Sequence, residues 1–184
     1  MMRFLNSPKP WDENPKRAQM RKMTLAALFA ALAVLLSPFS FPVGPSRCFP
    51  FQHTINGAAG VLLGPFWAFG AALVASLIRN FLGTGTILAF PGSLFGALAV
   101  GLAAKLLPQK YRFFAALAEP FATGTLGAWV ASFIVSTPGG QMAMFATLST
   151  AFLLSSVPGA VLGCCLLRFL PKGSAEQQVR GVMA

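Results

Sequence analysis

The sequence predicts an all-α integral membrane protein, a bundle of six transmembrane helices with both termini in the cytoplasm. Only 10% of the 184 residues are charged and 55% are hydrophobic, whereas a soluble domain carries about 25% charged residues. The mean hydropathy is +0.68. The apolar residues form long uncharged segments, and most basic residues collect near the two termini and in one connecting stretch.

A basic tail, residues 1–22, precedes the first uncharged segment, which runs over 23–46. A helix needs roughly 20 apolar residues to cross a hydrocarbon core, so we expect a first span at about 23–38, ending near Ser37 and Pro38. A basic start before an apolar run is also how a signal peptide begins. The length of this run and the lack of a small-residue cleavage site predict a retained span instead.

The next uncharged stretch, 48–78, is too long for one span and is divided by Pro65. Because proline cannot continue the helical hydrogen-bond ladder, we expect two short spans at about 50–64 and 66–80. Crossing twice also places the basic stretch 105–112 on the same side as the basic tail. The positive-inside rule favours that arrangement.

The remaining apolar segments predict three more spans, at about 91–107, 113–136 and 143–170. Together the six spans form a membrane domain over 23–171, which a cytoplasmic tail, 172–184, follows. All but two of the 14 basic residues then lie on the inner side. We do not expect nucleic-acid binding, because this distribution is that of a membrane protein rather than of a basic soluble surface.

No catalytic or metal-binding set is visible. The three cysteines lack metal-ligand spacing, and neither HExxH nor GxSxG occurs. Glu119 is the one acid inside a predicted span, on its inner side, whereas His53 lies near the outer end of another, so we do not expect them to meet. We therefore predict no enzymatic activity, no metal and no cofactor. For Glu119 we favour a structural or coupling role over ligand contact.

Polar residues gather where the second span begins, and we interpret them as part of a ligand pocket near the outer face. Polar groups are costly next to hydrocarbon and should face protein, water or a ligand. The alternative is hydrogen bonding between helices, worth about 0.6 kcal/mol on average in membranes. The predicted ligand contacts are Gln52, His53, Asn56, Arg79, Asn80, Phe90 and Trp129, and Arg47 faces either the pocket or the headgroups. We expect His53→Ala to weaken binding by about tenfold or more without unfolding the protein.

Four alanines give the first span a face of small residues: Ala26, Ala27, Ala30 and Ala31. Such a face lets another helix approach closely in lipid. The neighbour is either another helix of this chain or a partner protein.

Several sequence blocks resemble the ThiW family over about residues 20–170. They are Phe41-Pro42-Val43-Gly44-Pro45, Phe49-Pro50-Phe51-Gln52-His53, Arg79-Asn80-Phe81-Leu82-Gly83-Thr84-Gly85-Thr86 and Ala89-Phe90-Pro91-Gly92-Ser93. Members of that family are substrate-binding S-components of energy-coupling-factor (ECF) transporters. Relatives carry Tyr-Pro at the outer end of the fifth span, where this chain has Ser136-Thr137-Pro138, so no tyrosine contact is carried over.

The resemblance implies a binding subunit of an ECF-type importer in a prokaryotic cell membrane, with hydroxyethylthiazole, the thiazole precursor of thiamin, as substrate. It also implies a transmembrane coupling subunit that contacts the alanine face, and two ATPase subunits that hydrolyse ATP. The alternatives are another small vitamin or precursor as substrate, such as the aminopyrimidine or thiamin, a stand-alone permease, or a structural membrane subunit that binds no ligand.

Overall fold

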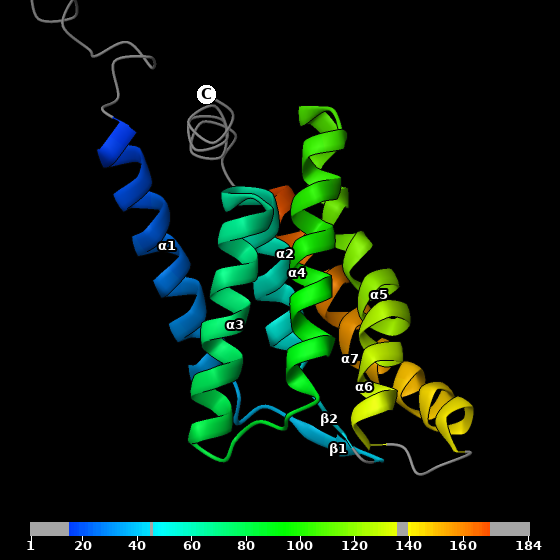
Figure 1. The fold of residues 1–184 in the computed structure, drawn as a ribbon. Coiled ribbons are helices and arrows are strands. Elements are labelled where there is room, and N and C mark those ends of the chain that lie inside the picture. The colour runs from blue at the N-terminus through cyan, green and yellow to red at the C-terminus, as the bar shows by residue number, and fades with distance from the viewer. Residues whose placement is uncertain (1–14, 45, 136–139, 170–184) are drawn as a thin grey trace, which may run out of the picture.

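The computed structural model describes residues 15–44, 46–135 and 140–169, which form a bundle of helices with a two-stranded hairpin at one end (Figure 1). The regular helices are α1 (Pro15–Leu35), α2 (Pro50–Leu63), α3 (Pro65–Phe81), α4 (Ala89–Leu106), α5 (Ala118–Ala122), α6 (Ala128–Val135) and α7 (Gln141–Phe169). The hairpin consists of β1 (Phe41–Val43) and β2 (Ser46–Cys48), and two irregular helical turns are η1 (Gln109–Leu117) and η2 (Thr123–Gly127).

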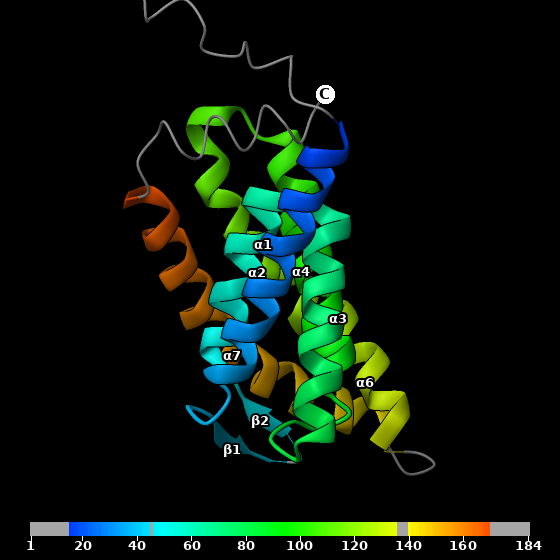
Figure 2. The same ribbon diagram turned by 90° about the vertical axis from the view of Figure 1, so that its left-hand side faces the viewer.

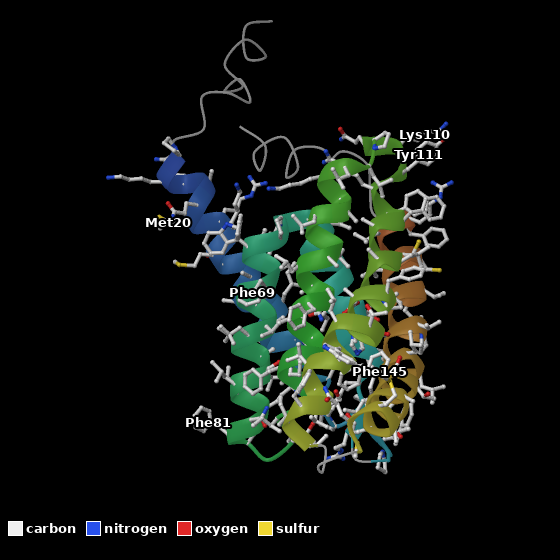
Figure 3. All side chains as sticks on the ribbon, turned by 45° about the vertical axis from the view of Figure 1, so that its right-hand side comes forward. Met20, Phe69, Phe81, Lys110, Tyr111 and Phe145 are labelled. Atoms are coloured by element: carbon white, nitrogen blue, oxygen red, sulfur yellow. The ribbon has the colours of Figure 1, made fainter. Side chains whose placement is uncertain are left out.

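The helices α1, α2, α3 and α4 run in alternating directions between two ends of the bundle, the segment from α5 to α6 then runs back, and α7 returns (Figures 1 and 2). One end, which we call the basic end, holds the start of α1, the α2–α3 junction, η1 and the end of α7. The other, the hairpin end, holds the hairpin and the segment 82–88. Figure 3 places Lys110 and Tyr111 at the basic end and Phe81 at the hairpin end.

Apart from Arg47 and Arg79, the described basic residues lie on elements at the basic end: Lys16, Arg17, Arg21, Lys22, Lys105, Lys110, Arg112 and Arg168. This is the distribution that the positive-inside rule favours if the basic end faces the cytoplasm. The orientation itself stays a prediction.

Three of the described helices are long and apolar enough to cross a membrane: α1, α4 and α7. The α2 helix has 14 residues and α3 has 17. At 1.5 Å per residue they extend about 21 and 26 Å, less than a hydrocarbon core of about 30 Å. The structure therefore supports a helical membrane protein, while the number of complete spans stays a prediction.

The junction between α2 and α3 lies where the sequence places it, at Gly64 and Pro65. Gly64 has φ +86°, a left-handed conformation that favours glycine. Pro65 then occupies the first turn of α3, where its missing N–H costs no hydrogen bond. A Cβ on Gly101 of α4 would overlap the Pro65 backbone, so α4 passes directly against this corner.

The hairpin between α1 and α2 is not foreseen in the sequence analysis. It pairs Phe41 with Cys48 and Val43 with Ser46, and its turn includes Gly44 with φ +56°. Two strands of three residues are too short to give a period-of-two pattern. The hairpin lies between the start of α2 and that end of the bundle, so α2 begins inside the bundle (Figure 1).

The fifth predicted span, over 113–136, is helical throughout its described part, but it is not one regular α-helix. The described part is η1, α5, η2 and α6 in succession. The cause lies in close packing at Gly124 and Gly127, where an added Cβ would come within 2.7 Å of Leu153 Cδ2 and of the Pro91 carbonyl oxygen, respectively. Ser149 Oγ also donates a hydrogen bond to the Gly124 carbonyl oxygen at 2.6 Å.

The core is built largely from small side chains, which allow the helices to approach closely. Ala26 and Ala30 of α1 are buried against α2 and α3, whereas Ala27 and Ala31 are exposed. The four alanines therefore do not form one free face. Ala26 and Ala30 pack inside the protein, whereas Ala27 and Ala31 are accessible to a neighbouring helix.

Candidate functional site

A small cavity lies at the hairpin end, between the hairpin, the segment 82–88, the ends of α2, α3 and α4, and the middle of α7. Its volume is about 20 Å³, which is room for about one water molecule. The lining residues come from β2, α2, α3, α4, α7 and the connections next to them: Ser46, Arg47, Phe49, Gln52, His53, Arg79, Thr86, Leu88, Ala89, Gly92, Ser93, Phe152 and Ser155.

Arg79, in the last turn of α3, is the most buried charged side chain of this cavity. It is 1% exposed. Its Nη1 donates a hydrogen bond to Gln52 Oε1 at 2.5 Å, and its guanidinium carbon lies 3.6 Å from the centroid of the Phe49 ring. Its Nε and Nη2 groups are buried and have no hydrogen-bond partner among the residues that the structure describes. Arg79 therefore does not snorkel to the headgroups but points into the protein.

A chain of buried hydrogen bonds leads from Arg79 into the centre of the bundle. Gln52 Nε2 donates to Asn56 Oδ1 at 3.3 Å and to Ser93 Oγ at 3.2 Å. Asn56 Nδ2 in turn donates to Glu119 Oε1 at 2.9 Å. The amide side chains thus link the guanidinium to a carboxylate that is completely buried.

The expectation that His53 and Glu119 lie apart is wrong. His53 Nδ1 lies 2.7 Å from Glu119 Oε1 in a buried ion pair or charge-assisted hydrogen bond. Two features bring them together. The hairpin sets the start of α2 deep in the bundle, and η1 advances by about 2.0 Å per residue instead of 1.5 Å. Nine residues of η1 therefore carry Glu119 further from the basic end than an α-helix would.

A histidine paired with an acid is also an arrangement that activates nucleophiles. None of the hydrogen bonds of the described residues joins His53 to a serine, threonine or cysteine. The thiol of Cys48 donates instead to the Ala151 carbonyl oxygen at 3.3 Å, and burial raises the pKa of this thiol, so it stays protonated. The part of the chain that the structure describes assembles no nucleophilic triad, and the absence of catalysis stays a prediction.

The remaining predicted contacts are not among the cavity-lining residues. Asn56 lies behind Gln52 and Ser93, and Asn80 Nδ2 donates to the Ser76 and Thr86 carbonyl oxygens at 2.8 and 3.1 Å, which fixes the segment 82–88. Phe90 is half-buried beside the cavity residue Ala89. Trp129 is 41% exposed and packs on Phe133 and Phe145.

The α7 helix supplies two lining residues that sequence reasoning missed, Phe152 and Ser155. The backbone N–H of Phe49 donates to Ser155 Oγ at 2.7 Å, so α7 holds the start of α2 in place. Thr54 Oγ1 donates to the Gly159 carbonyl oxygen at 2.9 Å, one residue after Pro158. The sequence feature that could have indicated Ser155 as a cavity residue is a polar side chain within an apolar segment.

Ser46, Thr86, Leu88, Gly92 and Ser93 also line the cavity without being predicted as contacts. Most of them belong to the blocks that carry the family resemblance. Arg47, whose direction the sequence left open, lies at the mouth of the cavity and is exposed.

Long apolar helices with exposed apolar faces define this chain as a helical membrane protein, and it holds a polar cavity near one end. A family model described as thiamine-precursor transporter protein (ThiW) matches residues 23–173, and the chain belongs to this family. The resemblance given by the sequence blocks is thereby confirmed. No curated protein and no solved structure matches the chain.

Proposed function

We propose that this protein is the substrate-binding subunit of an ECF-type importer in a prokaryotic cell membrane and that its substrate is hydroxyethylthiazole. The observation that carries the proposal is the cavity at the hairpin end, in a chain of the thiamine-precursor transporter family. A few convergent polar groups on apolar walls are typical of small-molecule sites. Here Arg79, Gln52 and Ser93 supply the polar groups, and Phe49 and Phe152 supply aromatic surface.

Binding requires the cavity to widen, because its volume of about 20 Å³ accepts one water-sized group and not a substituted thiazole. The segment 82–88 and the hairpin form the wall nearest the end of the bundle. The one side-chain bond described between this segment and the end of α1 joins Ser37 Oγ to Thr84 Oγ1 at 3.3 Å. Displacement of this wall would admit the ring.

Transport would depend on a transmembrane coupling subunit and two ATPase subunits. The sequence contains no Walker A motif, so ATP hydrolysis is assigned to the partners. The exposed pair Ala27 and Ala31 offers the coupling subunit a smooth surface on α1. A stand-alone permease would instead carry the substrate into vesicles without partners or ATP.

The first test is equilibrium binding to the purified full chain in detergent, followed by tryptophan fluorescence and thermal stabilisation. The ligands are hydroxyethylthiazole, the aminopyrimidine precursor, thiamin and riboflavin. We expect selective binding of the thiazole. Binding of another of these compounds would keep the binding function and change the substrate, and binding of none would favour the structural-subunit alternative.

A further inference from the structure

We propose that the cavity is built for an anionic group, and that the substrate is a thiazole carrying a carboxylate or phosphate which accepts hydrogen bonds from Arg79 Nε and Nη2. This inference rests on the proposed function, since it specifies the chemical class of the ligand in the same site. It changes the expected substrate from a neutral alcohol to an anion.

The first argument is the state of Arg79. A buried guanidinium is costly unless it is paired and hydrogen-bonded. Arg79 is 1% exposed, yet of its three nitrogens only Nη1 has a described partner, and that partner is a neutral amide. The Nε and Nη2 groups lie on one edge of the planar guanidinium, the fork that binds two oxygens of a carboxylate or phosphate.

The second argument is the charge of the lining. Arg47 lines the same cavity at its mouth, and none of the described lining residues is acidic. Two guanidinium groups around one cavity favour an anion and steer it inward. Serine and threonine side chains add neutral hydrogen-bonding groups, and Phe49 covers the face of the Arg79 guanidinium, leaving its edge for hydrogen bonds.

Glu119 does not serve as the missing counter-ion. Its Oε1 accepts hydrogen bonds from His53 and Asn56, and Gln52 and Asn56 stand between it and Arg79 in the chain of hydrogen bonds. Gln52 Oε1 is in turn held toward Arg79 because Gln52 Nε2 donates to Ser93 Oγ. The network therefore positions the guanidinium without neutralising it.

The size of the cavity fits this assignment. Its volume of about 20 Å³ corresponds to about one water-sized group, which is the size of a single oxygen. Under the proposal, an anionic oxygen would lie in this small cavity beside Arg79, while the ring would need the outer wall to move. The outer wall of the cavity includes Thr86 and Leu88.

The test compares three ligands on the purified full chain by equilibrium binding: hydroxyethylthiazole, its phosphate monoester, and the analogue whose hydroxymethyl carbon is replaced by a carboxylate. We expect at least one anion to bind about tenfold or more tightly than the alcohol, as charge-assisted hydrogen bonds imply. Arg79→Gln should remove this preference, and Arg79→Lys should retain only part of it, because an ammonium lacks the planar fork.

The control is Lys105→Gln, which removes one positive charge from an exposed site at the basic end. It should leave the affinities for all three ligands unchanged. Thermal unfolding without ligand shows whether each variant folds. If Arg79→Gln does not fold, the wild-type comparison and Arg79→Lys decide the matter.

The outcomes separate the two proposals. Tighter binding of the alcohol than of both anions overturns the anionic assignment and leaves the proposed function intact. An anion preference that survives both Arg79 variants overturns the role of this residue. Binding of none of the three thiazoles overturns the proposed substrate, and the anionic assignment falls with it.

Discussion

At the scale of single residues, the most consequential contact is the buried pair of His53 and Glu119. The two side chains are 8% and 0% exposed, and the nitrogen and oxygen lie 2.7 Å apart. A buried pair contributes little net stability relative to apolar residues, but removal of one partner leaves an uncompensated polar group. The Oε2 atom of Glu119 already lacks a hydrogen-bond partner, so Glu119 depends strongly on His53 and Asn56.

This pair changes what we expect of His53→Ala. The variant should be destabilised by about 3–5 kcal/mol, so weaker ligand binding would come together with a lower unfolding temperature. Adding Glu119→Gln should restore much of the lost stability, because the neutral amide no longer needs a cationic partner. Thermal unfolding in detergent of the two single variants and the double variant measures the energetic coupling between His53 and Glu119. If the effects of the two substitutions on stability are additive, the two side chains are not coupled.

At the scale of helices, α4 contacts the irregular fifth segment through Gly96. A Cβ on this residue would lie 2.5 Å from Thr123 Oγ1 and 2.6 Å from Glu119 Cγ. These atoms belong to α5 and η2, and Glu119 is also held by α2. The absence of a side chain at Gly96 therefore lets three segments meet around the buried carboxylate.

We expect Gly96→Ala to destabilise the protein by about 1–3 kcal/mol through overpacking. The matched control is Gly70→Ala in α3, because a Cβ there meets nothing within 4 Å. That variant should be as stable as the wild type or more stable by up to about 1 kcal/mol, the helix-propensity difference. The unfolding temperatures of the two variants, compared with that of the wild type, test this difference. Equal destabilisation at both positions would contradict the packing argument.

Some helix boundaries can be predicted from the sequence, whereas others depend on packing between distant segments. The break between α2 and α3 follows from Pro65 alone, which is why it could be predicted. The η2 turn packs against α7 at Gly124 and against α4 at Gly127, and η1 also contacts α4 and α7. A single-sequence pattern does not contain such contacts. Glu119 lies between η1 and η2. An interpretation of this segment as a regular helix therefore placed Glu119 too far from His53.

At the scale of the whole molecule, the separation of charge between the two ends gives a topology that can be measured. We expect the hairpin end to face outward and the basic end to face the cytoplasm. In a background with Cys164→Ala and Cys165→Ala, a membrane-impermeant thiol reagent should label Arg47→Cys on intact cells. Lys110→Cys should be labelled only after permeabilisation.

The buried Cys48 serves as the internal control, because the background variant alone should stay unlabelled. Labelling of Lys110→Cys on intact cells, with Arg47→Cys protected, would invert the topology. Both positions are exposed at opposite ends of the bundle, so the experiment does not depend on the details of the cavity.

Sequence reasoning brought together three residues that line one cavity, but it did not predict their hydrogen-bond partners. The polar residues at the start of α2 and the end of α3 mark the cavity, since Gln52, His53 and Arg79 all line it. Their partners are distant in sequence, as the contact of His53 with Glu119 illustrates. Register between helices depends on the hairpin and on irregular turns, and neither leaves a clear periodic signal.

The small volume of the cavity has a consequence for timing. Under the proposed function, a cavity of about 20 Å³ is too small for a substituted ring, so the substrate would enter only after the wall at residues 82–88 opens. At high substrate concentration the rate of loading then reaches a ceiling equal to the rate of opening. Under the proposed function, the same wall would also slow the release of the bound substrate, and a partner that holds the wall apart would speed that release.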